Sequence, residues 1–185
     1  MKREPRETNE ETLAGALLLA HPTLKESNFR RTVILMSAHS AEGAMGVVIN
    51  RPMGKRLGEL QGDFALGPLA GVPLCNGGPV EQKQLVLVAW ERQDNGFRLH
   101  FGIEPDHAKQ LRDTEDADLR AFVGYAGWTG GQIEQELERN TWVVVTAPRD
   151  LFSLPMDASL WRTLLAREGA EWRLLADEPE ETGQN

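Results

Sequence analysis

The sequence predicts an α+β fold built on a mixed β-sheet, because strand-like and helical segments are unevenly distributed along the chain. Apolar stretches bounded by turn residues, which are typical of strands, dominate the first half. Amphipathic helical patterns lie mainly in the second half. Strands and helices do not follow the regular alternation of βαβ units, which argues against a doubly wound sheet.

Length and composition predict a single globular domain. The chain has 185 residues, of which 41% are hydrophobic and 26% charged, and it shows no internal repeat or linker. We expect one domain over residues 12–176. The flanks are expected to be a disordered charged N-terminus at residues 1–11 and an acidic disordered tail at residues 177–185.

Apolar runs rich in Val, Ile and Leu predict the strands of the sheet. Pairs of runs joined by His39–Gly43 and by Asn95-Gly96 have the connections expected of hairpins. The hairpin Thr32–Asn50 and the run Leu119–Tyr125 are apolar at nearly every position, so both need two covered faces and should share one sheet. The runs expected to form strands are Leu13–Ala20, Thr32–Ala38, Ala44–Asn50, Leu85–Trp90, Phe97–Ile103, Leu119–Tyr125 and Trp142–Thr146.

Helices are predicted where a start signal precedes an amphipathic pattern. Pro105 can open a helix that runs to Asp113, because proline suits an early helical position. Gly169 ends the longest helical pattern. The remaining expectations are helices at Gly131–Arg139 and Asp157–Glu168, a short element at Trp172–Leu175, and an irregular Lys55–Gly71 with one helical turn at Leu57–Gln61.

Charge and cysteine content disfavour several classes of function. The formal net charge is −8, and the acidic tail carries much of it, so the chain has no global attraction for nucleic acid. The longest apolar run, Ala14–Ala20, is too short to span a bilayer. The single cysteine, Cys75, cannot form an internal disulfide and is expected to be a buried core thiol. We therefore expect a cytoplasmic protein without membrane contact.

The glycine-rich segment Gly124–Glu134 follows a predicted strand and precedes a predicted helix. That order suits an anion site, but the spacing fits neither common phosphate-binding motif. Thr129 and Gln132 have the spacing of a capping box, which would satisfy the first helical N–H groups internally. The segment is therefore expected either to be a structural turn that presents Tyr125 and Trp128, or to bind a neutral or cationic ligand.

A second glycine pair, Gly77 and Gly78, lies between extended segments and before a proline. It predicts a tight turn with positive φ, or a bare backbone that a ligand could approach. Arg51, at the end of a predicted buried strand, could clamp an anion or pair with an internal carboxylate such as Glu134.

The histidines give weak indications of function. His100, Glu104 and His107 have a faint resemblance to a metal set, but Pro105 breaks the helix that would align them, so no metal site is expected. His39 lies near a predicted strand end, as does His21, and surface or capping roles are expected for both.

Taken together, these segments resemble the YqgE/AlgH family from about Leu13 to the C-terminus. The resemblance rests on the following stretches: Leu13–Pro22, Phe29–Met36, His39, Gly43–Pro52, Gly77–Val80, Gly124–Trp128 and Gly131–Glu136. Departures from the family pattern are Thr129-Gly130 where Gly-Pro is usual, and Ile133 where Leu is usual. The resemblance implies a bifurcated sheet, partly closed into a small barrel and surrounded by helices.

The same resemblance implies no established activity, although members are often labelled transcriptional regulators. The sequence shows no helix-turn-helix and no basic recognition helix, so direct DNA binding is not expected. We expect a non-enzymatic binding or regulatory protein without a cofactor, whose partner is a small ligand or another protein. The expected site comprises Asn50, Arg51, Gly77, Gly78, Tyr125, Trp128, Gln132 and Glu134.

The alternative interpretation is an enzyme that acts on a small polar substrate. In that case Glu134 or Glu136 would be the general base and Arg51 would hold the substrate's anionic group.

Overall fold

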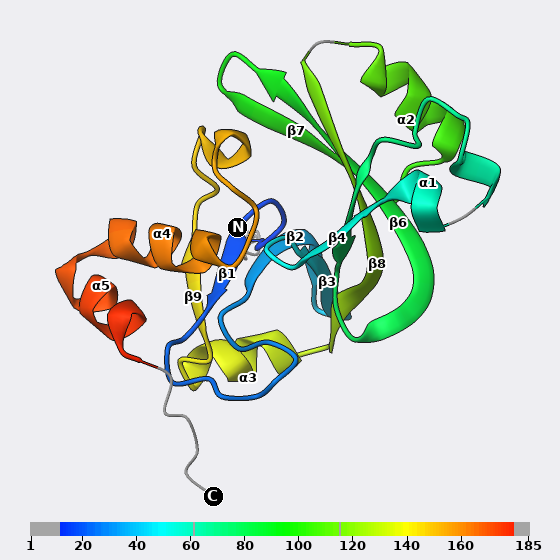
Figure 1. Cartoon of the computed structure of the whole chain (residues 1–185). Helices are drawn as coiled ribbons and strands as arrows, with labels where there is room; N and C mark the ends of the chain where they lie inside the picture. The colour runs from blue at the N-terminus through cyan, green and yellow to red at the C-terminus, as the bar shows by residue number, and fades with distance from the viewer. Residues whose placement is uncertain (1–11, 61, 115, 180–185) are drawn as a thin grey trace, which may run out of the picture.

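The computed structural model describes residues 12–60, 62–114 and 116–179 (Figure 1). The predictions of disorder for residues 1–11 and for residues 180–185 fall outside this part of the chain. Within the described part, the tail predicted from residue 177 onward begins at the last residue of a helix, Asp177.

Strands and helices are mixed as an α+β protein requires. The strands are β1 (Leu17–Ala20), β2 (Val33–Ser40), β3 (Gly43–Val48), β4 (Pro52–Arg56), β5 (Pro73–Asn76), β6 (Val80–Gln93), β7 (Gly96–Phe101), β8 (Ala117–Thr129) and β9 (Trp142–Val145). The α-helices are α1 (Leu57–Leu60), α2 (Pro105–Arg112), α3 (Gln132–Glu138), α4 (Ser159–Glu168) and α5 (Ala170–Asp177). Single 3₁₀ turns lie at Gly62–Phe64 and Leu151–Ser153.

Strand β8 is the branch point of the sheet. One edge of β8 pairs with β6 along most of its length, from Ala117 to Tyr125. The other edge pairs first with β5, in parallel, and then with β3, antiparallel. One branch therefore continues to β4, and the other continues through β2 and β1 to β9. This is the bifurcated, mixed sheet that the family resemblance implies, and it is curled into a half-barrel with helices around it (Figure 1).

The predicted sharing of one sheet by the first hairpin and the strand at residues 119–125 is confirmed. Strands β2 and β3 form that hairpin, with a bulge between Met36 and Ala38, and β3 then pairs with β8. Residues 33–36 of β2 and 46–48 of β3 are buried. The covered faces that uninterrupted apolar strands require are supplied by helices and loops on each side of the sheet.

Three apolar clusters pack against this sheet. The largest lies beneath α4, where the indole N–H of Trp161 donates to the carbonyl of Ala20 at 2.8 Å. The second includes Trp128, Trp142 and Ile133 and lies beneath α3. The third packs α2 and the loop around Leu69 against β6 and β8. The sheet thus carries a covered face at each of its branches (Figure 1).

Several predicted boundaries are wrong. The first strand begins at Leu17, because Gly15 has a φ of 82° and turns the chain. Strands β4 and β5 were missed. All residues of β4 are exposed, so it lacks the apolar pattern that marks a strand. The final short element is a full helix, α5.

The largest correction concerns the glycine-rich segment after residue 124. Strand β8 continues through Gly124 and Gly127 to Thr129, so most of the predicted turn is sheet. Pairing of Gly43 with Thr129 and of Ala44 with Trp128 holds this part of β8 extended. Glycines in this strand mark close backbone approach and not chain reversal.

Candidate functional site

Asn50 and Arg51, in the connection between β3 and β4, bind the start of β2 and the loop that precedes it. The Asn50 side chain is 4% exposed, accepts from the N–H of Val33 and donates to the carbonyl of Arg31, both at 2.9 Å. The Arg51 guanidinium donates to the carbonyls of Asn28, Ser27 and Arg30, at 2.6, 3.1 and 3.3 Å. Burial lowers the pKa of this guanidinium. Arg51 therefore does not pair with Glu134, which has another partner.

The glycine pair Gly77-Gly78 lies against the start of the glycine-rich segment at Gly124. The N–H of Gly77 donates to the carbonyl of Val123, and a Cβ at Gly77 would overlap the carbonyl of Gly124. Gly78 has a φ of 147°, and a Cβ there would overlap the carbonyl group of Tyr125. These contacts place Gly77 and Gly78 beside residues 123–126 of β8. Each glycine allows a backbone crossing that no other residue fits.

Tyr125 and Trp128 point to opposite faces of β8, because side chains three positions apart in a strand alternate. The Tyr125 ring is half-buried at the edge of the largest apolar cluster, whereas Trp128 belongs to the cluster beneath α3. The predicted site therefore separates into two regions. One contains the glycine crossing and Tyr125, and the other contains Trp128, Gln132 and Glu134.

In the second region, the Glu136 carboxylate joins two tryptophans. Its Oε2 accepts from the indole N–H of Trp128 at 2.9 Å and from that of Trp142 at 2.7 Å, while Oε1 accepts from the Gln132 amide at 3.1 Å. Both tryptophans are less than one-tenth exposed. A carboxylate with three donors on it is held as a structural acceptor, so Glu136 is poorly suited to be a general base.

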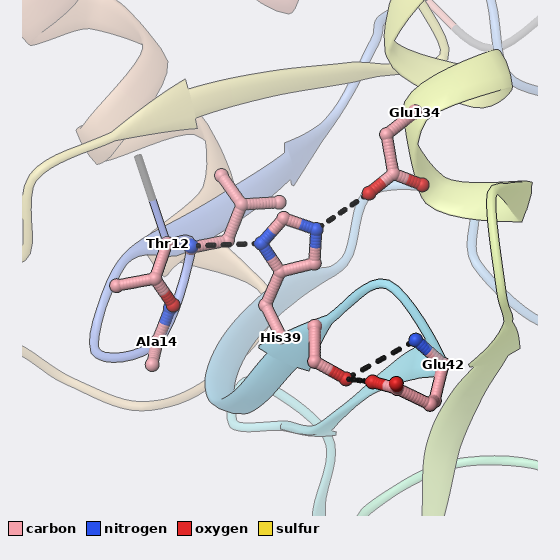
Figure 2. Close-up of polar contacts among 7 residues, drawn as sticks. Thr12, Ala14, His39, Glu42 and Glu134 are labelled. Atoms are coloured by element: carbon pink, nitrogen blue, oxygen red, sulfur yellow. Dashed lines mark hydrogen bonds and ion pairs between the residues drawn. The ribbon is translucent and has the colours of Figure 1, made fainter. Parts of the chain in front are cut away.

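His39 connects the second region to the start of the described chain (Figure 2). Its Nε2 lies 2.6 Å from Oε1 of Glu134, and its Nδ1 accepts from the N–H of Leu13 at 3.1 Å. The accepting Nδ1 assigns the proton to Nε2, which donates to Glu134. This hydrogen bond is the main cause of the lowered pKa of the Glu134 carboxyl. Both ring nitrogens are occupied, so His39 is a connector here and not a free base.

The predicted capping box at the start of α3 is only half formed. Gln132 accepts from the N–H of Thr129 at 3.1 Å, but the Thr129 hydroxyl caps no helical N–H. The N-cap is Gly131, with a φ of 79°, so the helix begins at Gln132. Thr129 is still paired with Gly43 in the sheet, which is why it cannot act as the cap.

A cleft of about 380 Å³ opens beside Tyr125, in the first region. It arises because the register of β6 against β8 shifts between Val80 and Leu85, so that residues 81–84 bulge out of the sheet. Glu81 in this bulge has a φ of 49°. Strained backbone of this kind gathers at binding sites. The cleft is lined by Met45, Gln84, Leu85, Val86, Leu87, Phe101, Gly102, Ile103, Glu104, Pro105 and Tyr125.

The polar groups of the cleft are few, and none is used by the fold. The structure shows no hydrogen bond or ion pair, within its described residues, for the Tyr125 hydroxyl, the Gln84 amide or the Glu104 carboxylate. Their surroundings are aliphatic and aromatic side chains. A mostly apolar cleft with a few uncommitted polar groups is the usual form of a small-ligand site.

Sequence reasoning placed Tyr125 in the site and missed the rest of the cleft. The other walls come from Met45 of β3, from residues 84–87 of β6 and from residues 101–105, which run from the end of β7 to the start of α2. The one available signal was the polar run at residues 81–84 beside a buried strand, which indicates interrupted pairing. Glu104 was considered only as a member of a metal set.

The remaining reactive side chains do not form a second centre. Cys75 is 3% exposed, and burial raises the pKa of its thiol, as expected of a core cysteine. The His100 ring lies 5.5 Å from that of His107, and its Nε2 is 3.2 Å from Glu91. Among residues 12–60, 62–114 and 116–179, no group of three His, Cys, Asp or Glu could hold a metal ion. The helices in the same ranges are too short or too polar to cross a membrane.

Comparison with known proteins identifies the family. A family model described as AlgH-like matches residues 17–173. A UPF0301 protein of Streptomyces coelicolor is 35% identical and covers 96% of this chain and 98% of its own length. Another UPF0301 protein, from Chlorobium limicola, is 33% identical and covers 92% and 95%.

Solved structures show the same fold. The crystal structure of protein DIP2367 from Corynebacterium diphtheriae aligns with a TM-score of 0.71 at 26% identity, covering 96% of this chain and 95% of that one. The solution structure of the AlgH protein from Pseudomonas aeruginosa aligns with a TM-score of 0.65 at 30% identity, covering 98% and 100%. On these grounds, and on the fold described above, the chain belongs to the AlgH-like (YqgE/AlgH, UPF0301) family.

Proposed function

We propose that this protein is a non-enzymatic binding protein that holds a small, largely apolar ligand in the cleft beside Tyr125. The proposal rests on a contrast between two sets of polar side chains. Those of the cleft have no partners among the described residues of the fold, whereas the other candidate groups, Arg51, Glu134 and Glu136, all do. The cleft presents three polar groups that the fold does not use, above an apolar floor. Its volume, about 380 Å³, lies within the range of small-molecule sites, which is roughly 300–1,000 Å³.

The enzyme interpretation receives less support, because its proposed groups have structural partners. Arg51 is bound to three backbone carbonyls, and Glu134 is bound to His39. Glu136 accepts from two indoles and an amide. A general base and an anion clamp must both reach one substrate, and these groups have no site in common.

Placement in the cytoplasm and an indirect role in regulation remain part of this proposal. The regulatory role is suggested by the label of transcriptional regulator that members of the YqgE/AlgH family often carry, and the charge distribution argues against direct contact with DNA. We expect affinity for DNA at physiological salt to be about 10⁻⁴ M or weaker, as for non-specific binding. Tight, sequence-dependent binding in a salt-controlled titration would replace the proposal with a direct regulator.

A thermal-shift screen of small fragments tests the binding proposal. A ligand that binds only the folded state stabilises it, by about 1.4 kcal/mol at ten times its Kd. For a domain of this length that corresponds to a rise in Tm of about 3–6 °C. Hits should be lost in Gln84→Trp, whose large side chain would fill the mouth of the cleft. They should be kept in Gln82→Trp, which lies on the same bulge but outside the lining.

Hits that stabilise both variants equally would place the ligand elsewhere, and a screen without hits would contradict the proposal. Each hit should also be recovered chemically unchanged after incubation with the protein, as judged by its NMR spectrum. Conversion of a hit that is lost in Glu104→Gln would make the cleft an active site.

A further inference from the structure

We propose that the cleft beside Tyr125 selects ligands that carry a positively charged amine on an apolar body, with Glu104 as the counter-ion. The inference rests on the proposed function, since it concerns the same cleft. It adds the charge and chemical class of the occupant, which the apolar lining alone does not specify.

The carboxylate of Glu104 lies at the start of α2 and makes no hydrogen bond to the helix. Glu104 is the N-cap residue of α2, with extended backbone at φ −68° and ψ 151°. It is exposed, and no ion pair forms to it within the described residues. Neighbouring Asp106, by contrast, is paired with Lys109 at 3.0 Å. The carboxylate of Glu104 is thus available to a ligand.

The charge of the lining is negative and uncompensated. The side chains that line the cleft, taken over the described residues, include one carboxylate and no lysine, arginine or histidine. Glu104 lies at the exposed edge of apolar walls, so a ligand that places an ammonium group beside its carboxylate can also bury an apolar body against those walls. An anionic ligand would meet only repulsion from Glu104.

The aromatic and amide groups suit the same class of ligand. Tyr125 and Phe101 both line the cleft, and the faces of such rings attract cations at about 6 Å or less. The Gln84 amide and the Tyr125 hydroxyl each supply an oxygen that can accept from an ammonium N–H. Met45, Leu87 and the rings provide the surface for the apolar body of the ligand.

Three probes of one shape but different charge test the inference: 2-phenylethylamine, 2-phenylethanol and 3-phenylpropionate. Calorimetric titration should show the amine binding at least tenfold more tightly than the alcohol, with the carboxylate weakest. In Glu104→Gln, which removes the charge and keeps the shape, the preference for the amine over the alcohol should fall to less than threefold. Binding of the alcohol should be unchanged.

Asp106→Asn is the matched control. It removes one negative charge from the same first turn of α2 but lies outside the lining of the cleft. It should keep the preference for the amine within about twofold of wild type, since exposed charges at a distance are screened by salt. Equal loss of the preference in both variants would overturn the role of Glu104, because a general change in net charge would then explain the result.

The remaining outcomes separate this inference from the proposed function. Tighter binding of the alcohol or the carboxylate would overturn the inference and leave a ligand site in the cleft. No binding of the amine at millimolar concentration would also overturn it. The fragment screen, whose hits need not carry charge, then decides whether the binding function itself stands.

Discussion

Nε2 of His39 lies 2.6 Å from Oε1 of Glu134, and this contact joins β2 to α3 across 95 positions of sequence (Figure 2). The imidazole is mostly covered, with 14% of the side chain exposed, whereas the carboxylate is 46% exposed. A protonated imidazole carries N–H on both nitrogens, so it could no longer accept from Leu13 at Nδ1. Because His39 contacts both Leu13 and Glu134, it links the start of the described chain to the helix after β8.

Glu134→Ala should lower the free energy of unfolding by about 0.5–1 kcal/mol at pH 7, because a hydrogen bond from a neutral imidazole to a half-exposed carboxylate contributes about that much. The pKa of Glu134 is lowered in the folded state, mainly by the hydrogen bond from His39. Its contribution is therefore present above the unfolded value of 4.5 and is lost as pH falls through the folded pKa. Urea unfolding at several pH values should show wild type and Glu134→Ala converging as the pH falls below 4.5.

Glu138→Ala is the control for this measurement, because Glu138 lies exposed on the same helix and makes no side-chain contact with His39. It should show no such convergence. A stability difference for Glu134→Ala that stays constant from pH 7 to pH 3 would contradict the assignment.

Glu136→Leu should be the most destabilising of the carboxylate substitutions. It leaves the indole N–H groups of Trp128 and Trp142 without their acceptor, and both side chains are buried. An unsatisfied buried donor costs about 1–3 kcal/mol, so the expected loss for the two indoles is roughly 2–6 kcal/mol. Chemical unfolding against Glu138→Leu measures it. A loss below about 1 kcal/mol would mean that water replaces the carboxylate at both indoles.

Gly78→Ala should lower stability by at least about 2 kcal/mol. The substitution combines a backbone conformation that side chains rarely adopt with overlap between its Cβ and the carbonyl group of Tyr125. Gly62→Ala is matched as a control, since a Cβ there meets no atom within 4 Å and φ is not positive. Similar unfolding midpoints for the two variants would show that the crossing of β8 over Gly78 can relax.

The start of α3 gives a pair of contrasting expectations. Thr129→Ala should change stability by no more than about 0.5 kcal/mol, because Thr129 is an exposed strand residue whose hydroxyl caps no helical N–H. Gly131→Ala should cost about 1 kcal/mol or more, since it forces an L-residue to a φ of 79°. Thermal unfolding of both variants checks this. A larger loss of stability for Thr129→Ala would mean that the Thr129 hydroxyl does cap the helix.

The sequence was sufficient for those elements whose burial pattern is uninterrupted. The apolar runs of β2 and β3 predicted interior strands, and the valine-rich run of β9 predicted a strand that lies at the edge of the sheet. Periodicity and the flanking Gly169 identified α4 in the same way. These signals lie within a few neighbouring residues, so they can be recognised without knowledge of the rest of the fold.

The features that were missed depend on contacts between distant segments. Strand β4 is wholly exposed and pairs with β5, which is distant in sequence. Continuation of β8 past Gly124 depends on β3 lying alongside, and that pairing also displaces the start of α3 to Gln132. Local glycine and capping patterns favoured a turn there, and tertiary pairing overrode them.

The predicted site mixed residues that carry structure with one that lines a cleft. Arg51 and Gly78 have the residue types of binding sites, but here they fix the backbone. Glu104 was not predicted, because its importance follows from the bulge in β6 and from the segment before α2, which meet only in the folded protein. The spacing of these residues in the sequence therefore gives no sign that they line one cleft.

Tyr125 is the only tyrosine in the chain, so its ring is a single spectroscopic reporter at the wall of the cleft. Protein labelled with ¹³C at the tyrosine ε positions should give one ring resonance set by NMR. The account predicts that each ligand that raises Tm shifts this resonance with the same Kd as the calorimetric titration, and that the shift disappears in Gln84→Trp. A ligand that stabilises the protein yet leaves the Tyr125 resonance unmoved at saturation would contradict binding in this cleft.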